Sequence, residues 1–506
     1  MNFHPNLLAD DPHDQALAAD VRPPAWVNPV PSGRYNLVVI GAGPAGLVCA
    51  AGAAGLGARV ALVERAFMGG DCLNAGCVPS KGMVRAARAL ADVRNGGRFG
   101  VRADRADCDF AAVMERIRRL RAGIGRHDTA RRFRDELGVE VFFGQARFAG
   151  RDCVEVEGRQ LLFHRAAICT GTRAAIPPIP GLAEARPFTN ETVFTLSRLP
   201  PRLAVIGGGP VGCELAQAFA RFGSRVTLIH RGARILERED TDAAVLLQTV
   251  LVREGIDLRL NSAVARVSSR DGTHLLYLAG ADEAPLIEAD AVLVATGRVP
   301  NLEGLGLEAV GIASTEAGVR VDDRLRTANP RVYAAGDICS PCKFTHAADA
   351  QARILLANAL FKGRRKVSRL VVPRCTYTDP EIAQVGINGQ EAQARNIAAT
   401  TLTVELADVD RAVLDGETEG FVRVHLRKNS GTILGATLVG RHAGETIGEL
   451  SLAITAGLGI DAIGRTIHPY PTQAEAIRKL ADAYNRTRLT RPVQTLLAGW
   501  LRWQRR

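Results

Sequence analysis

Two copies of one glycine pattern constrain the fold more than any other feature of the chain. "YNLVVIGAGPAG" (35–46) and "RLAVIGGGPVG" (202–212) each run from a short apolar strand into GxGxxG, then into a helix-like segment and a further strand. In such a unit the first glycine makes the turn, the second lets the backbone approach a diphosphate, and the third allows close packing of helix on strand. One such pattern is weak evidence. Two of them predict an α/β protein with two Rossmann-like dinucleotide-binding domains.

The side chains that follow each second strand distinguish the two sites. Glu64 lies 23 residues after Gly41, where a carboxylate can bind the ribose hydroxyls of a dinucleotide. The same offset in the second unit falls in a basic cluster made of His230, Arg231, Arg234 and Arg238. Because such a cluster would bind a 2′-phosphate, the first site is predicted to take FAD and the second NADPH rather than NADH. The alternative that these arginines are merely solvent-exposed stays open.

Composition and charge narrow the class of protein. A chain of 506 residues that is 47% hydrophobic can bury several cores, which indicates more than one domain. It has no apolar run of the roughly 18–20 residues that a membrane span needs, and its first thirty residues are polar. We therefore expect a cytoplasmic protein. The net charge of +11 is spread along the chain without a recognised nucleic-acid module, so no nucleic-acid partner is expected.

A cysteine pair lies in "GGDCLNAGCVPSK" (69–81), where Cys72 and Cys77 are separated by four residues. The pair begins eight residues after Glu64, so it is expected close to the reactive ring of the first dinucleotide. A permanent disulfide is disfavoured in the cytoplasm, and zinc is disfavoured because no second ligand pair accompanies the motif. The pair is therefore predicted to be redox-active, and no metal site is predicted.

Five motifs together give the chain a family resemblance: GAGPAG, GGDCLNAGCVPSK, GGGPVG, ATGRVPN and AAGD. Over about residues 34–490 it resembles the class I pyridine nucleotide–disulfide oxidoreductases, FAD-containing homodimers that include dihydrolipoyl dehydrogenase, glutathione reductase and mercuric reductase. The resemblance implies that Cys77 faces the flavin and that Cys72 exchanges with substrate. It also implies an ion pair of Lys81 with Glu214 near the flavin, and a contact of Asp337 with FAD. On the residues alone, Lys81 opens a helical stretch (81–93) and could equally lie at the surface.

The resemblance and the glycine patterns together define the expected site residues. The expected catalytic residues are Cys72, Cys77, Tyr470, Glu475, His468, Lys81 and Glu214. The expected FAD-binding residues are Gly41, Gly43, Pro44, Ala45, Gly46, Glu64, Arg65, Gly70, Asp71, Lys81, Thr170, Gly171, Gly336 and Asp337. The expected residues at the NADPH site are Gly207, Gly209, Gly212, His230 and Arg231. Thr296, Gly297 and Arg298 are further expected cofactor-binding residues, and Thr296–Gly297 matches one of the family's two strand-end turns.

The motif order also predicts the domain organisation. Residues 1–33 are expected to be a proline-containing arm, and 34–185 with 302–370 an FAD-binding domain. Residues 186–301 are expected to bind NAD(P)H, and 371–485 resemble the family's α+β dimerisation domain. In the basic tail 486–506, Val493, Leu496, Leu497, Trp500 and Leu501 share a helical stripe. Docking in a core or on a partner is the preferred use of this stripe, and membrane contact is not expected.

The stretch "IHPYPTQAEA" (467–476) indicates the branch of the family. Disulfide-reducing relatives place a histidine immediately before Pro-Thr-x-x-Glu, whereas this chain has Tyr470 there, and a phenol is a poor acid–base group at neutral pH. The Pro-Tyr-x-Thr pattern resembles mercuric reductases. His468 could still serve the dithiol, or be a structural histidine at a turn.

The cysteines depart from the mercuric reductase pattern. That branch ends in a C-terminal cysteine pair and often begins with a heavy-metal-binding module, but here the last cysteine is Cys375 and no CxxC lies near the N-terminus. Metal delivery by such a relay is therefore not supported. Cys339 and Cys342 form a CxxC that could bind a soft metal, although buried thiols without a function are the preferred reading.

These observations lead to one expected activity and two alternatives. We expect this protein to be a homodimeric, mercuric-reductase-like enzyme. It is expected to pass electrons from NADPH through FAD to the Cys72–Cys77 disulfide, and from there to a thiophilic metal ion or small disulfide. Dihydrolipoyl dehydrogenase is the alternative within the family. A flavin-bound redox sensor or scaffold, which keeps the cofactors but turns over slowly, is the alternative from another class.

Overall fold

The first glycine pattern belongs to a seven-stranded sheet in the computed structural model, which describes residues 7–8, 10–103, 105–279 and 286–505. The chain forms two units, one of residues 1–235 and 251–370 and the other of residues 236–250 and 371–506. In the first unit six strands follow one another across the sheet in the order β3 (Glu140–Phe143), β2 (Val60–Glu64), β1 (Arg34–Ile40), β6 (Arg159–Ile168), β5 (Cys153–Val156) and β4 (Arg147–Gly150). The seventh strand, β18 (Val332–Ala334), pairs with β6. Strands β3, β2, β1, β6 and β18 are parallel, and β5 and β4 form an antiparallel extension.

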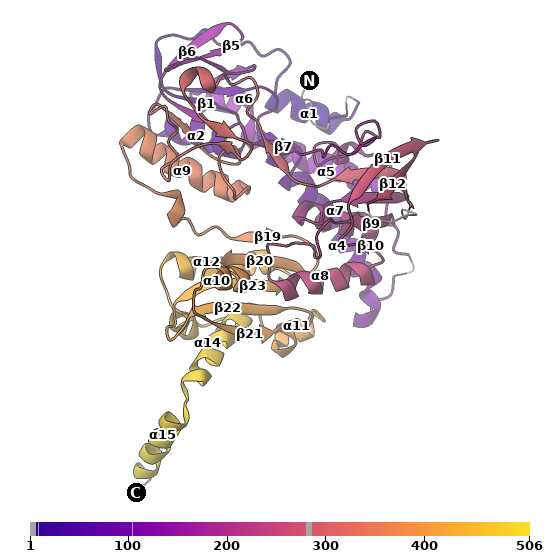
Figure 1. The fold of residues 1–506 in the computed structure, drawn as a ribbon, viewed down its shortest axis with the longest axis vertical. Helices are drawn as coiled ribbons and strands as arrows, with labels where there is room; N and C mark the ends of the chain where they lie inside the picture. Colours follow the sequence, from indigo (N-terminus) through magenta and orange to yellow (C-terminus); the bar gives the residue numbers. More distant parts are fainter. Residues whose placement is uncertain (1–6, 9, 104, 280–285, 506) are drawn as a thin grey trace. The chain divides into compact units, whose positions relative to one another are not determined.

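Two helices that are far apart in sequence cover one face of this sheet (Figure 1). Helix α2 (Pro44–Gly55) follows β1 directly, and α9 (Thr345–Phe361) packs against it. Apolar side chains of both helices share one core with Leu37 and Val39 of β1. Such strands, buried on both faces, read as nearly continuous hydrophobic runs, which is why "LVVI" announces β1 in the sequence.

The second glycine pattern opens a four-stranded parallel sheet in the same unit. Its strands, in spatial order, are β10 (Asp257–Arg259), β9 (Arg225–Ile229), β8 (Arg202–Ile206) and β14 (Ala291–Val294). Helix α7 (Pro210–Phe222) follows β8 and ends at Gly223, whose left-handed φ of 118° suits glycine. The remaining strands of this unit also pair antiparallel. They are the sheet of β11 (Val264–Arg270), β12 (Thr273–Leu278) and β13 (Leu286–Ala289), and the pairs β7 (Thr172–Ala174) with β15 (Arg298–Pro300) and β16 (Ser314–Thr315) with β17 (Gly318–Val319). The predicted α/β class with two Rossmann-like domains is confirmed.

Part of the expected N-terminal arm is a packed helix. Helix α1 (Pro12–Val21) lies against α5 (Phe110–Gly125), and its Leu17 and Val21 are fully buried. A buried ion pair joins Asp14 of α1 to Arg121 of α5. The apolar and charged contacts together make this segment part of the first unit rather than a free extension. Helix α6 (Ala130–Asp135) completes this region.

The second unit is built on a five-stranded antiparallel sheet. Its strands, in spatial order, are β19 (Arg374–Thr376), β20 (Glu381–Gly386), β23 (Ile433–Gly440), β22 (Phe421–Arg427) and β21 (Ala399–Glu405). Its helices are α10 (Gly389–Ala394), α11 (Asp410–Leu414), α12 (Ala443–Thr455), α13 (Ile460–Arg465), α14 (Glu475–Arg488) and α15 (Arg491–Trp503). Leucines and isoleucines of α12, α13 and α14 form one core with Val424 and Leu438 of the sheet. This is the α+β region expected after residue 370.

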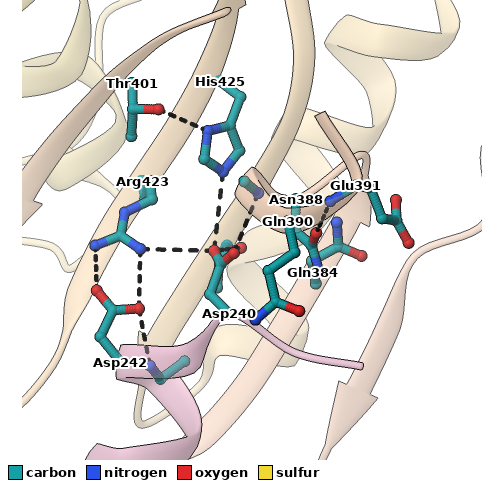
Figure 2. A network of polar contacts seen from close by, with 12 residues as sticks. Asp240, Asp242, Gln384, Asn388, Gln390, Glu391, Thr401, Arg423 and His425 are labelled. Carbon is teal, nitrogen blue, oxygen red and sulfur yellow. Dashed lines mark hydrogen bonds and ion pairs between the residues drawn. The ribbon is translucent and has the colours of Figure 1, made fainter. Parts of the chain in front are cut away.

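Residues 236–250 belong to this second unit and include most of α8 (Thr241–Arg253). Figure 2 shows Asp240 and Asp242 turned toward side chains of the sheet. The buried Asp240 carboxylate accepts a hydrogen bond from Thr437 at 2.8 Å, and Nε2 of His425 lies 3.8 Å from it. Burial raises the pKa of Asp240, but the His425 contact and the Thr437 hydrogen bond outweigh it and lower the pKa to about 2. Arg423 adds an ion pair to Asp242.

The last helix, α15, lies apart from the sheet of the second unit (Figure 1). The predicted helical stripe is confirmed, but none of its side chains is buried. Among the described residues no helix combines the length and the apolar character that crossing a membrane requires.

Candidate functional site

Two consecutive helices position the cysteine pair. Cys72 lies in α3 (Gly70–Asn74), and Cys77 is the first residue of α4 (Cys77–Arg94). Helix α4 therefore begins four residues before Lys81, which the sequence had suggested as its start. Pro79 is tolerated there because the first turn of a helix makes no use of its missing N–H. Because Cys77 lies at the N-terminus of α4, the positive end of the helix dipole stabilises its thiolate form.

The pKa values of the two thiols are shifted in opposite directions. A hydrogen bond from Cys72 lowers the pKa of Cys77 to about 6, with help from Thr345 and the Lys81 ammonium and against the effect of burial. The same hydrogen bond, together with burial, raises the pKa of Cys72 well above its ordinary range. Thr345 Oγ1 lies 3.4 Å from the Cys77 sulfur. All ten cysteines are free thiols here, so the structure shows the pair as a dithiol with one acidic member.

The predicted ion pair beside the cysteines is present. Lys81 Nζ on α4 lies 2.8 Å from Glu214 Oε2 on α7. Glu214 is buried and Lys81 is partly exposed. Lys81 therefore lies at the surface, with its side chain 38% exposed, and is paired with Glu214. The pair joins the helix of the cysteines to the helix of the second glycine pattern.

A second charged cluster gathers predicted residues from separate segments. Arg298 Nη2 lies 3.1 Å from Asp71 Oδ2, and Arg298 Nε lies 4.0 Å from Asp337 Oδ2. Thr172 links the last two, because it accepts from Arg298 at 2.7 Å and donates to Asp337 at 3.0 Å. Burial raises the pKa of Asp337 although Arg298 opposes it. Arg298 thus contacts two other predicted cofactor-binding residues, Asp71 and Asp337.

The first glycine loop has the backbone geometry that a dinucleotide requires. A Cβ on Gly41 would lie 2.4 Å from the Cys169 carbonyl oxygen, and one on Gly46 would lie 1.8 Å from the Gly41 carbonyl oxygen. In contrast, a Cβ on Gly43 would meet nothing closer than 3.8 Å. Gly43 precedes the N-terminus of α2, where Pro44 is the first residue, so the loop leaves open backbone for a diphosphate.

Two other predicted FAD residues, Gly70 and Gly336, lie at the same loop. Gly70 lies against Gly43, where a Cβ would come within 2.6 Å of the Gly43 Cα. Gly336 has a φ of 84°, and a Cβ there would lie 3.2 Å from that of Ala45. The carbonyl of Arg65 accepts a hydrogen bond from Arg22.

Glu64 can still accept from a ribose. Its carboxylate accepts hydrogen bonds from the backbone N–H groups of Ala42 at 2.6 Å and Ala66 at 2.7 Å. These use two of the roughly four lone-pair sites of a carboxylate, which leaves two for hydroxyl donors. Burial raises the pKa of Glu64 against these hydrogen bonds. The residues of this loop therefore fit FAD.

The second glycine loop repeats the design. A Cβ on Gly207 would lie 2.4 Å from the Ala295 carbonyl oxygen and one on Gly212 would lie 1.8 Å from the Gly207 carbonyl oxygen, while Gly209 faces open space. His230 lies against the loop, because the N–H of Gly208 donates to its Nδ1 at 3.2 Å. Arg231 is exposed and Arg234 is half-buried, both in the first unit. Arg238 falls in the second unit. The loop fits a pyridine nucleotide, with His230 beside it.

The two predicted strand-end turns are also formed. Thr170 Oγ1 donates to the Asn301 carbonyl at 2.9 Å, and Asn301 Nδ2 donates back to the Thr170 carbonyl at 2.8 Å. Thr296 Oγ1 donates to the Ala175 carbonyl at 2.9 Å. Gly171 and Gly297 both have positive φ, at 63° and 137°. The turns therefore tie the ends of β6 and β14 to the β7–β15 pair.

The remaining predicted catalytic residues lie in the second unit. The phenol of Tyr470 donates to Asp410 at 2.7 Å, which raises the pKa of Tyr470. His468 Nε2 lies 3.0 Å from the Glu449 carboxylate. Glu475 begins α14 and pairs with Arg478 at 3.2 Å. These three groups are close to one another in sequence, but each has its own partner.

The sequence reasoning missed three polar residues of this site: Thr345, Thr172 and Asn301. Thr345 is the first residue of α9 and contacts Cys77. A threonine before an apolar helical run indicates the start of a helix, and this was the signal in the sequence that could have drawn attention to it. Thr172 and Asn301 act through side-chain hydrogen bonds across β7 and β15, which no sequence spacing announces.

The second cysteine motif shows no metal site. The expectation that both thiols are buried is wrong for Cys342, which is exposed, while burial raises the pKa of Cys339 far above its ordinary range. Within the described ranges there is no group of three or more His, Cys, Asp or Glu side chains placed to bind a metal ion.

Family models match most of the chain. The pyridine nucleotide-disulphide oxidoreductase model matches residues 35–352, and the dimerisation-domain model of the same family matches residues 372–481. The chain belongs to this family. It is therefore a flavoprotein oxidoreductase that binds FAD and NAD(P)H, and it carries the family's dimerisation domain.

The similar proteins include mercuric reductases and dihydrolipoyl dehydrogenases. A mercuric reductase of Streptomyces lividans is 36% identical over 458 residues, covering 89% of this chain and 96% of the relative. A dihydrolipoyl dehydrogenase of Geobacillus stearothermophilus is 33% identical over 456 residues, covering 88% and 96%. The solved structure of the HOCl-induced flavoprotein disulfide reductase RclA from Escherichia coli, as a Cu(II) complex, is 28% identical with a TM-score of 0.79, covering 88% of this chain and 99% of that one. The resemblance to class I disulfide oxidoreductases with a mercuric-reductase-like sequence is confirmed.

Proposed function

We propose that this enzyme uses NADPH to reduce a thiophilic metal ion through the Cys72–Cys77 dithiol. One observation carries the proposal: the chain combines a dithiol that has one acidic thiol with a tyrosine, Tyr470, at the sequence position where disulfide-reducing relatives have a histidine. The mercuric reductases among the relatives support the same class of acceptor.

The chain's own residues supply binding, charge and nucleophile. The Gly41–Gly46 loop and Glu64 would hold FAD, and the Gly207–Gly212 loop would hold the nucleotide. Bound FAD would supply the two-electron link between the nicotinamide and the cysteine disulfide. The Lys81–Glu214 pair places a cation beside the Cys77 thiolate, and Cys72 donates a hydrogen bond to that thiolate. Cys72 is proposed as the thiol that meets the acceptor.

The acceptor follows from the proton balance. When a dithiol reduces a disulfide, the leaving thiolate must be protonated, and a neighbouring acid speeds that step. When a dithiol reduces a divalent metal ion to the metal, the two sulfurs lose two electrons and become a disulfide. The metal ion gains both electrons, and the protons go to solvent. Hydrogen bonding to Asp410 raises the pKa of Tyr470, which makes this phenol a weak acid and suits an acceptor that needs no proton.

We further propose NADPH as the preferred nucleotide and a homodimer as the active form. Exposed Arg231 and half-buried Arg234 follow the end of β9 and would bind a 2′-phosphate. Tyr470 is 70% exposed and Ile467 is 93% exposed, which fits a loop that a partner subunit covers. In the homodimer, the 468–475 loop of one subunit would cover the cysteine pair of the other. We also propose that residues 34–185 with 302–370 bind FAD, that residues 186–301 bind NADPH and that residues 371–485 form the dimer.

Dihydrolipoyl dehydrogenase is the second candidate. The contact of His468 with Glu449 favours it, because a histidine oriented by a carboxylate is a suitable general base. A slowly reacting flavin-bound sensor is the third, and it predicts no steady turnover with any acceptor.

The deciding experiment measures NADPH oxidation by the FAD-loaded enzyme with Hg(II), Cu(II), lipoamide or glutathione disulfide as acceptor. We expect a metal ion to give the highest kcat/KM. The double variant Cys72→Ser/Cys77→Ser should lose this turnover and keep FAD bound, since the glycine loop and Glu64 lie elsewhere. Cys342→Ser, which changes an exposed thiol outside the pair, is the matched control and should behave as wild type.

Two results would contradict the proposal. A higher kcat/KM with lipoamide that His468→Gln abolishes would establish the second candidate. Wild-type metal reduction by the double cysteine variant would show that the pair takes no part.

A further inference from the structure

Helix α15 displays an apolar face that the described part of the chain does not cover. At about 100° per residue, Val493, Leu496, Leu497, Trp500, Leu501 and Trp503 fall on one side of this helix. None of them is buried, and Leu496 is 74% and Trp500 55% exposed. The two tryptophan rings lie 5.0 Å apart, so they form one continuous aromatic surface. Exposing such a face costs free energy in water unless something covers it.

The opposite face carries positive charge alone. Arg491 and Arg502 lie on the side away from the tryptophans, and Arg505 follows the end of the helix. The stretch 486–506 contains six arginines and no Asp or Glu. The surface that covers the apolar face must therefore carry negative charge around an apolar interior.

We propose that α15 lies in the interface of an anionic phospholipid membrane. Its tryptophans and leucines would enter the boundary between headgroups and acyl chains, and its arginines would contact the lipid phosphates. Tryptophan is suited to this depth because its ring is apolar and its indole N–H can bond to water or headgroups. The thirteen residues of α15 span roughly 20 Å, which suits a helix lying in the plane of the interface.

Two other occupants fit less well. A second copy of the chain carries a net charge of +11, which on average repels a helix that bears arginines and no acid. Nucleic acid would bind the arginines but leave the apolar face exposed. The helix also lies beyond residue 481, where the match to the family's dimerisation domain ends. Of the two uses expected from the sequence, docking in a core is not observed among the described residues, and docking on a partner stays a prediction.

The test is co-sedimentation of the FAD-loaded, full-length protein with vesicles. One set contains phosphatidylcholine alone, and the other contains equal parts of phosphatidylcholine and phosphatidylglycerol. We expect binding to the anionic vesicles and a blue shift of tryptophan fluorescence. Leu497→Ser/Trp500→Ser should lower the partition coefficient at least about tenfold, because each large side chain loses apolar burial. The matched control Thr495→Ser/Ala498→Ser, which changes the polar face, should bind as wild type.

The charged face has its own variant. Arg491→Gln/Arg502→Gln should weaken binding to the anionic vesicles by about fivefold per arginine. FAD content and Tm report whether each variant is folded, and both should stay unchanged because α15 packs on no described core.

Three results would overturn the proposal. The first is a wild-type protein that binds neither vesicle. The second is vesicle binding that Leu497→Ser/Trp500→Ser leaves intact. The third is that Leu497→Ser/Trp500→Ser loses the dimer in sedimentation equilibrium while the wild type binds no vesicle. In that case a second copy of the chain would cover the apolar face of α15.

Discussion

The acidity of Cys77 can be tested by changing only its hydrogen-bond donor. The largest cause of its lowered pKa, about 6, is the hydrogen bond from Cys72. At that pKa roughly 90% of Cys77 is thiolate at pH 7, against roughly 3% for an ordinary cysteine. Cys72→Ser keeps a donor at this position, whereas Cys72→Ala removes it. Because Thr345 and Lys81 remain in both variants, the alanine variant should recover only part of the ordinary pKa.

The measurement is the pH dependence of alkylation by iodoacetamide in the FAD-loaded protein, followed by mass spectrometry of the peptide that contains Cys77. Exposed Cys342 is replaced by serine throughout, so that it does not compete for reagent. The midpoint should lie near 6 in Cys72→Ser and at least about one unit higher in Cys72→Ala. The midpoint is compared rather than the rate, because a thiolate of lower pKa is also intrinsically less nucleophilic. Equal midpoints in the two variants, or a midpoint near 8.5 in Cys72→Ser, would refute the reasoning.

Three further substitutions test other parts of the structure. Arg231→Glu should remove or invert a preference for NADPH of roughly ten- to hundredfold in kcat/KM, since one charge-assisted hydrogen bond contributes about 1.5–3 kcal/mol; equal use of both nucleotides by the wild type would argue against the assignment. Asp14→Ala leaves the buried guanidinium of Arg121 without its carboxylate and should lower the free energy of unfolding in urea by about 3–5 kcal/mol, whereas Asp14→Leu/Arg121→Met should cost less. Because the folded-state pKa of Asp240, about 2, lies below its unfolded value, its contribution of about 2 kcal/mol is present above about pH 4 and is lost as pH falls toward 2. Asp240→Asn should therefore flatten the loss of stability in this range, and an unchanged acid profile would contradict the pKa direction.

The local rules of chain geometry made much of this protein predictable from its sequence. A glycine at Gly41 or Gly46 is required because any Cβ would overlap a carbonyl oxygen, so the two glycine patterns announce two Rossmann units wherever they occur. The stripe at 493–501 likewise predicted α15, because helical periodicity depends only on neighbouring residues. The cysteine spacing and the basic cluster after β9 are visible for the same reason.

Tertiary structure alone decided how distant residues combine. The Lys81–Glu214 pair joins residues 133 positions apart, and Arg298 meets Asp71 and Asp337 from separate segments. The same holds for Thr345, whose hydroxyl reaches Cys77 from a helix that begins 268 residues later. The sequence could name the two cysteines, but their opposite acidities depend on a hydrogen bond, burial and a nearby ammonium, which exist only once the chain has folded. Periodicity could not say whether the apolar face of α15 is covered, because that depends on what lies beside the helix in space.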